Sequence, residues 1–308
     1  MAVYNIGEYI KTRRKALGIT QEDLANGICS VLTLSRIERG TQLPQDCTLV
    51  QILQRIGLSS SEMFLAANDK HLFFSQLKFD IRQAYIQENY EEAKKILRDN
   101  RDQISKLSPF DRQTFETIDI LLRIRDKQCG ESEALERLEA ALRLTYPKYS
   151  KDNLPRLFTY EEILLLNNIA IRYAHLGDLN TVIDMLYHIK DFYDKKVCDI
   201  EEALRTKPMV LYNLSKRLGQ AKKYTECISV CEEGINLATK TGRCSCLPQT
   251  YYNLSCCLYY RNRPGDMEAS LEYMKLAYYS AKGMMRKESE EKYAKLILER
   301  YNILIESL

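Results

Sequence analysis

Apolar side chains recur at helical spacing in short segments over residues 1–66, and glycines or capping residues separate these segments. The pattern predicts five short helices. Thr20, followed by acidic residues, is expected to cap the second helix, and Ser30 is expected to cap the third. Gly40 and Gly57 stand where the third and fourth helices should end. A short second helix followed closely by a third predicts a helix-turn-helix.

The chain from residue 72 onward has longer amphipathic segments separated by short breaks, which predicts long helices. Three of these segments are similar and align on Asn168, Asn213 and Asn253, which are 45 and 40 residues apart. Tetratricopeptide repeats have a period of about 34 residues. We therefore interpret the segments as that helical-pair unit with longer helices or loops.

The predicted fold is all-α, with a helix-turn-helix domain followed by a tetratricopeptide-like α-solenoid. The expected organisation is a helix-turn-helix domain at 1–66, a linker at 67–71, five helix pairs at 72–286 and a C-terminal capping helix at 287–308. An irregular helical bundle is the alternative, but it does not explain the recurring asparagine.

The composition is that of an ordinary globular protein. The chain has 308 residues, of which 45% are hydrophobic and 28% charged, with a formal net charge of +3, and this argues against intrinsic disorder. No stretch approaches the roughly 18 uncharged apolar residues that a membrane span needs. The first residues lack the apolar core of an export signal. We therefore expect a cytoplasmic protein without a membrane partner.

Ten cysteines raise the question of a metal site. Cys227 and Cys231 have a spacing that zinc accepts, and Cys256 and Cys257 follow one repeat later. The three histidines are scattered, and the cysteines fall at apolar helical positions that suit buried thiols. We expect neither a metal nor a cofactor, and a redox role for these four cysteines stays open.

The sequences GITQEDLA at 18–25 and LSRIERG at 34–40 resemble the repressor-type (XRE/Cro) helix-turn-helix family. The resemblance implies that the second helix meets a DNA phosphate and that the third lies in the major groove. The expected DNA contacts are Gln21, Ser30, Val31, Leu32, Thr33 and Arg36.

Arg36 is the expected base reader, because a guanidinium can bond guanine O6 and N7 together. Val31 and Leu32 depart from the polar residues usual in this family; they either pack on thymine methyl groups or indicate readout of DNA shape. The resemblance also implies that Arg14 and Glu38 form an internal ion pair.

Stacked helix pairs form a superhelix whose first helices line a concave groove. The three aligned asparagines fall at one first-helix position that should face this groove, where an amide can bond both the C=O and the N–H of a peptide backbone. The expected peptide contacts are Asn168, Arg172, Asn213, Lys216, Arg217 and Asn253. The alternative, in which the asparagines cap or bridge neighbouring helices, stays open.

A repressor-type helix-turn-helix followed by five such pairs resembles the Rgg/PlcR-type (RRNPP) receptors of Gram-positive bacteria. The resemblance implies a homodimeric transcription regulator that binds a double-stranded DNA operator under the control of a short signalling peptide. The alternative is a protein-interaction scaffold, whose groove holds a folded partner while the helix-turn-helix acts as a tether or a peptide-independent repressor. No enzyme is expected, because the sequence shows no recognisable catalytic motif.

Overall fold

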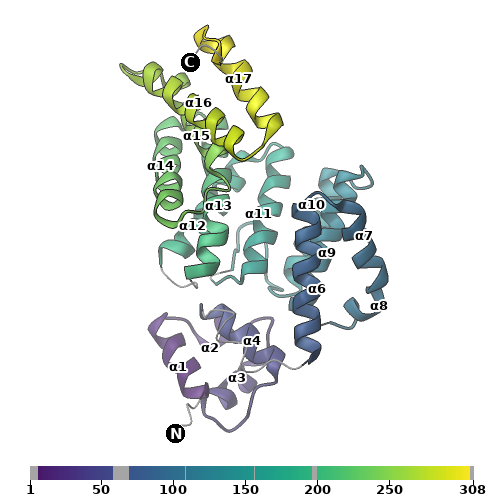
Figure 1. Ribbon diagram of the computed structural model, residues 1–308. Coiled ribbons are helices and arrows are strands. Elements are labelled where there is room, and N and C mark those ends of the chain that lie inside the picture. Colours follow the sequence, from purple (N-terminus) through teal and green to yellow (C-terminus); the bar gives the residue numbers. More distant parts are fainter. Residues whose placement is uncertain (1–5, 58–68, 108, 156, 196–199, 306–308) are drawn as a thin grey trace. The chain divides into compact units, whose positions relative to one another are not determined.

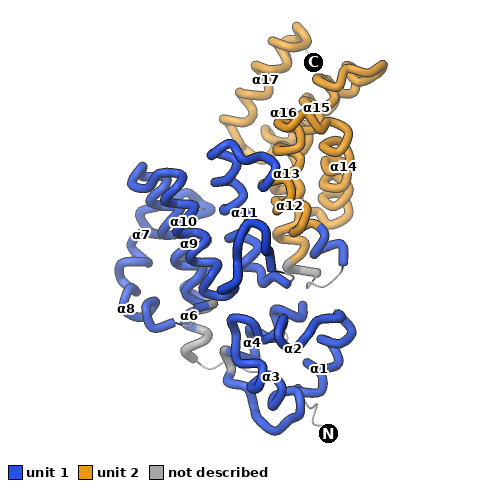
Figure 2. The backbone as a smooth tube through the Cα atoms, turned by 180° about the vertical axis from the view of Figure 1, so that it is seen from behind, with its two compact units in different colours: residues 1–181, 191–202 blue, residues 182–190, 203–308 orange. Residues whose placement is uncertain are grey.

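The computed structural model describes residues 6–57, 69–107, 109–155, 157–195 and 200–305. The chain forms two compact units, which are coloured separately in Figure 2. Unit 1 comprises residues 1–181 and 191–202, and unit 2 comprises residues 182–190 and 203–308.

Within residues 6–57 of unit 1 the structure describes four short helices, which we call the head (Figure 1). They are α1 (Ile6–Ala16), α2 (Gln21–Ala25), α3 (Val31–Glu38) and α4 (Asp46–Arg55). The fifth helix expected after Gly57 falls at residues 58–68, outside the described residues.

The ends of these helices confirm the capping signals of the sequence. Thr20 Oγ1 accepts a hydrogen bond from Asp23 N at 3.0 Å, and Ser30 Oγ accepts one from Thr33 N at 3.0 Å. Gly40 has a φ of 71° just after the end of α3. This left-handed conformation costs glycine little, and it stops the helix.

The rest of the described chain is a succession of longer helices. In unit 1 these are α6 (Asp69–Ile86), α7 (Tyr90–Asp99), α8 (Arg101–Ile104), α9 (Pro109–Arg125), α10 (Glu131–Arg143) and α11 (Tyr160–His175). Two helices cross the division between the units, α12 (Leu179–Asp194) and α13 (Ile200–Gln220). Unit 2 continues with α14 (Tyr224–Thr241), α15 (Leu247–Arg261), α16 (Asp266–Gly283) and α17 (Lys287–Tyr301).

This order confirms the predicted solenoid of helix pairs. In the described residues the chain order is compatible with the five expected pairs, α6/α7, α9/α10, α11/α12, α13/α14 and α15/α16, followed by α17 as a last helix. Helix α6 begins at Asp69, so the end of the segment expected as a linker, 67–71, is helical.

Each unit has its own buried apolar cluster. In unit 1, Phe115 of α9 packs with Ile81 of α6 and Ala93 of α7, and all three are nearly fully buried. In unit 2, Met274 of α16 packs with Ile297 of α17. Among the helices within the described ranges, none combines the length and apolar character needed to cross a bilayer.

Candidate functional site

Glu38, at the end of α3, is held by side chains of α1 and α2. Its carboxylate accepts bonds from Arg14 Nε at 2.6 Å, Arg14 Nη2 at 2.9 Å and Gln21 Nε2 at 2.7 Å. Burial by itself would raise the pKa of Glu38, but these bonds and the charges of Arg14 and Lys11 lower it overall. Glu38 therefore stays ionised and joins three helices of the head, which confirms the expected Arg14–Glu38 ion pair.

Helix α3 exposes three of the residues expected to read DNA. Val31 and Leu32 expose 43% and 57% of their surface, although both are apolar. Arg36 lies one turn after Leu32, on the same helix face, and is also exposed. Among the described residues, no side chain forms an ion pair or hydrogen bond with the Arg36 guanidinium.

Three other expected DNA contacts are engaged within the head. Ser30 caps α3, and its Oγ lies 2.8 Å from Thr33 Oγ1. Gln21 is the first residue of α2, and its side-chain amide is bonded to Glu38. These bonds place the three side chains firmly, and their contact with DNA stays a prediction.

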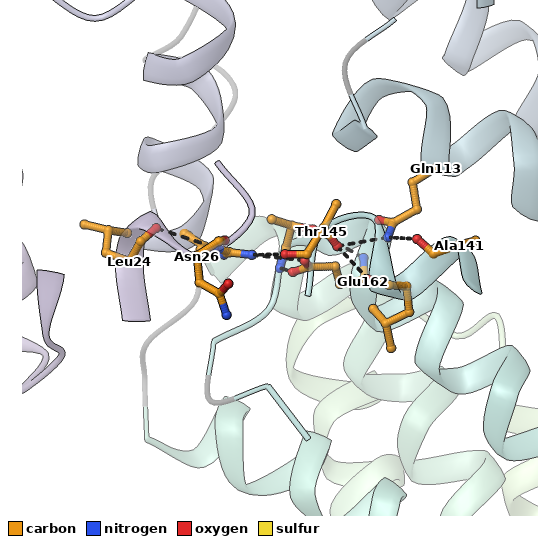
Figure 3. A network of polar contacts seen from close by, with 9 residues as sticks. Leu24, Asn26, Gln113, Ala141, Thr145 and Glu162 are labelled. Atoms are coloured by element: carbon orange, nitrogen blue, oxygen red, sulfur yellow. Dashed lines mark hydrogen bonds and ion pairs between the residues drawn. The ribbon is translucent and has the colours of Figure 1, made fainter. Parts of the chain in front are cut away.

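Arg55, the last residue of α4, joins the head to the repeat helices of unit 1. Figure 3 shows its partners, Leu24 and Asn26 of the head and Thr145 and Glu162 of the repeats. Its side chain is almost completely buried, and Nη2 lies 3.2 Å from Glu162 Oε1 in the first turn of α11. Nη1 donates to the carbonyl oxygens of Leu24 and Asn26 in the head. Nη2 also lies 3.5 Å from the carbonyl oxygen of Thr145, just after α10.

Two further features fix this contact. Glu162 Oε2 accepts a bond from Thr159 N at 2.8 Å, so the carboxylate caps α11 while it pairs with Arg55. Gly27, in the turn before α3, has a φ of 73°, and a Cβ there would overlap the carbonyl oxygen of Thr145. The head and the repeats of unit 1 therefore meet through a buried ion pair and a close backbone approach that requires glycine.

Two of the expected peptide contacts lie on α11 in unit 1. Asn168 Nδ2 donates to Leu164 O at 2.8 Å, one turn earlier in the same helix. Arg172 is buried, and its Nη1 lies 2.9 Å from Glu131 Oε2 at the start of α10. Arg172 thus has a carboxylate partner within unit 1, and its contact with a peptide stays a prediction.

Asn213 and Asn253 lie on α13 and α15 in unit 2, and each is 7% exposed. Asn253 Nδ2 donates to Tyr212 O at 3.3 Å and to Ser215 Oγ at 2.9 Å. These bonds join α15 to α13, which is the helix-bridging role that the sequence left open. Arg217 is also buried.

A cavity of about 570 Å³ lies in unit 2. Residues of α13, α15 and α17 line it, together with Tyr224 at the start of α14. The lining includes Lys216 and Asn253 but neither Asn213 nor Arg217. Among the described residues, no donor is bonded to Asn253 Oδ1, so the amide that bridges the helices also offers an acceptor at the cavity.

Five tyrosines line the cavity and give it aromatic walls: Tyr212, Tyr224, Tyr252, Tyr260 and Tyr293. The rings of Tyr252 and Tyr293 stack with their centroids 5.1 Å apart. Burial raises the pKa of Tyr293 to about 12 and also raises the pKa of Tyr252. These two hydroxyls are therefore uncharged at neutral pH and can donate hydrogen bonds.

Three cations also line the cavity: Lys216, Lys292 and Arg300. Lys292 Nζ lies 4.2 Å from the centroid of the Tyr252 ring, at a distance typical of a cation–π contact. Arg300 Nη1 donates to Cys256 Sγ at 3.3 Å. No acidic side chain is among the described residues that line the cavity, so its charge is positive.

The cysteines near the cavity are free thiols. Cys227 and Cys231 are fully buried, as the helical pattern indicated, and Cys227 Sγ lies 2.6 Å from Cys257 Sγ. Hydrogen bonds with Cys231 and Cys257, and burial, raise the pKa of Cys227, so it stays protonated. Within the described ranges, no group of three His, Cys, Asp or Glu side chains is placed to hold a metal ion.

Sequence reasoning missed Lys292 and Arg300 and the Arg55–Glu162 pair. The first two lie on the segment interpreted only as a cap, and exposed basic residues occur on most helices of this chain, so nothing local marked them. Arg55 and Glu162 are 107 residues apart, so only the tertiary fold brings them together.

The fold and these sites define a helix-turn-helix protein with a tetratricopeptide-like repeat domain. Residues 132–304 match the RNPP family C-terminal domain, and residues 10–63 match a helix-turn-helix family. The first match covers more than half of the chain, and the chain belongs to the RNPP family, which is a family of transcription regulators and not of enzymes.

Two solved structures of PlcR from Bacillus thuringiensis share this fold. The apo form has a TM-score of 0.60 at 19% sequence identity, and the alignment covers 94% of this chain and 98% of that chain. The complex with the peptide PapR7 and DNA has a TM-score of 0.57 at 19% identity, and covers 93% of this chain and 98% of that one. No curated protein sequence matches the chain.

Proposed function

We propose that this protein is a cytoplasmic, homodimeric transcription regulator whose head binds operator DNA and whose repeat domain binds a short signalling peptide that changes DNA binding. The observation that carries the DNA half is the exposed face of α3, where the Arg36 guanidinium has no partner among the described residues. Leu32 beside it supplies an apolar surface suited to thymine methyl groups.

The peptide half is supported by the cavity on the first helices of the repeats in unit 2. Its volume of about 570 Å³ is within the range of sites that enclose small ligands. Tyrosine rings supply apolar contact, and Asn253 Oδ1 supplies an acceptor for a peptide N–H. Family membership and the likeness to PlcR, crystallised with a peptide and DNA, favour this function over a scaffold for folded proteins.

In vitro selection from random duplex DNA with the full-length protein tests the proposed binding of the head to operator DNA. We expect enrichment of an inverted repeat whose half-sites are about 34 Å apart, or a multiple of that distance, because each protomer of a dimer presents one α3. Arg36→Ala should weaken binding to the selected duplex by roughly tenfold, in line with the loss of one bidentate base contact.

The matched control is Arg98→Ala, which removes an exposed arginine of α7, a helix that is not part of the head. It should leave DNA affinity unchanged. Failure to enrich any duplex would contradict the DNA half of the proposal, and a single half-site would contradict the dimer. A response of DNA affinity only to a folded partner protein, and to no short peptide, would favour the scaffold.

A further inference from the structure

The cavity in unit 2 concentrates cations that have no counter-ion. Lys216, Lys292 and Arg300 all line it, and none of them is within ion-pair distance of a carboxylate in the described part of the chain. Several other cations of unit 2 are paired with carboxylates. Lys190 and Lys207 both contact Glu233, and Lys295 contacts Glu299. The cavity therefore gathers in one place three cations that have no carboxylate partner in the described part of the chain.

The aromatic walls hold these cations in place. The Tyr252 ring lies under Lys292 Nζ, and the Arg300 guanidinium lies 5.6 Å from the centroid of the Tyr260 ring. Such contacts orient a cation without neutralising it. Burial, together with the charges of Arg217 and Lys292, lowers the pKa of Lys216, as expected when cations share a site that lacks an anion.

Tyrosine hydroxyls add hydrogen-bond donors to this charge. Ser289 and Tyr293 of α17 lie in the same lining, and burial keeps the Tyr293 phenol protonated. A carboxylate accepts hydrogen bonds at two oxygens, and it binds ammonium and guanidinium groups more strongly than a neutral acceptor does. The cavity thus offers what a carboxylate needs and contains no competing carboxylate among its described lining.

We propose that a carboxylate of the peptide binds in this cavity between Lys216, Lys292 and Arg300, with its neighbouring residues against the tyrosine rings. The assignment rests on the proposed peptide function and specifies its ligand as an acidic peptide. The carboxylate is either the C-terminal group or an Asp or Glu side chain, and both present the same chemistry to the three cations.

Two pools of random heptapeptides, one with free and one with amidated C-termini, separate these sources. Each pool is incubated with the full-length protein, and the retained peptides are separated by gel filtration and identified by mass spectrometry. If the C-terminal group binds, the amidated pool should yield at least tenfold less retained peptide. If a side chain binds, peptides retained from both pools should be enriched in Asp or Glu.

The double variant Lys216→Gln/Lys292→Gln should bind the retained peptides at least about tenfold more weakly, because hydrogen bonds to charged groups are lost. The control Lys240→Gln/Lys295→Gln removes two exposed charges of unit 2 that do not line the cavity, and it should bind them as the wild type does. Circular dichroism and thermal unfolding establish that both variants are folded.

Peptides retained without acidic enrichment or dependence on a free C-terminus would overturn the carboxylate assignment and leave the peptide function standing. Equal peptide affinity of the wild type and Lys216→Gln/Lys292→Gln would also overturn the carboxylate assignment and leave the peptide function standing. Retention of no peptide from either pool would contradict the peptide function itself, and the assignment with it.

Discussion

Buried cations in unit 1 and cavity cations in unit 2 differ in whether the protein supplies a carboxylate partner. Arg14, Arg55 and Arg172 are buried in unit 1, and each meets a carboxylate of the protein. Lys216 and Lys292 line a cavity in unit 2 that offers no carboxylate among its described lining. Buried pairs within a protein fix one conformation, whereas clustered unpaired cations leave a site that an anion from outside can fill.

This difference distinguishes the ion pairs of unit 1, which stabilise the fold, from the cavity cations of unit 2, which are available to a ligand. The unit 1 pairs tie helices together: Glu38 joins α1, α2 and α3, and Glu162 joins the head to α11. Removing one partner of such a pair leaves a buried charge without compensation. Removing a cavity cation relieves repulsion between like charges. The first kind of substitution should therefore lower the free energy of unfolding, whereas the second should leave it nearly unchanged or raise it slightly.

Arg55→Met should give the largest loss. It leaves the fully buried Glu162 carboxylate without its ion-pair partner, and it removes the hydrogen-bond donor of the carbonyl oxygens of Leu24 and Asn26. We expect the free energy of unfolding to fall by about 3–5 kcal/mol, measured by urea denaturation. Arg98→Met, at an exposed arginine, should change it by less than about 0.5 kcal/mol. If Arg55→Met lowered the free energy of unfolding as little as the control does, the Arg55–Glu162 pair would have no structural role.

Gly27→Ala tests the close approach between the head and Thr145. The added Cβ would overlap the Thr145 carbonyl and would also strain a backbone with a φ of 73°. Gly18→Ala is the matched control, since Gly18 has a φ of 66° but no atom within 4 Å of the added Cβ. The control should lose about 1 kcal/mol from strain alone. Gly27→Ala should lose more, and equal losses would argue against the contact.

Lys216→Gln/Lys292→Gln should leave the free energy of unfolding within about 0.5 kcal/mol of the wild type, or raise it slightly. The reason is that Lys292 contributes to the repulsion that lowers the pKa of Lys216. Urea denaturation without peptide measures the effect. A loss comparable to that of Arg55→Met would show that these lysines are structural, and the comparison between the units would fail.

Asp266→Asn extends the comparison between the units to a structural ion pair of unit 2, which Asp266 forms with Arg261 outside the cavity lining. Hydrogen bonds from Arg261 and from Arg263 N lower the pKa of Asp266 to about 2. A lowered pKa in the folded state means that the pair stabilises the protein above the unfolded pKa of about 3.9, and that this stabilisation is lost as the pH falls toward 2.

The melting temperature of Asp266→Asn should therefore be below that of the wild type at pH 6. The gap should close progressively between about pH 4 and pH 2. A gap of the same size across this range would show that Asp266 does not act through its charge.

Local signals explain most of what the sequence predicted correctly. Thr20 and Ser30 bond to backbone groups three residues away, and Gly40 acts through its own backbone, so each can be recognised within one turn of helix. The recurrence of asparagine likewise indicated the helix pairs, because repeats leave the same residue at equivalent positions.

The rest depends on distant segments meeting. The amide of Asn253 could bond a peptide or a neighbouring helix, and only the position of Ser215 on α13 decides that it bridges two helices. The three cavity cations come together only because α17 lies beside α13 and α15, and the sequence pattern of α17 does not predict this position. The ladder of three asparagines was therefore the less reliable part of the site, and the charge of the cavity could not be read in advance.

The most direct test of this account measures the affinity of the selected DNA duplex without peptide and as a retained peptide is titrated to saturation, for the wild type and for Lys216→Gln/Lys292→Gln. We predict that the peptide changes the wild-type Kd for DNA by at least about fivefold, as expected of an allosteric effector, and that the variant needs at least about tenfold more peptide for the same change. A peptide that demonstrably binds the wild type yet leaves its DNA affinity unaltered would contradict the account.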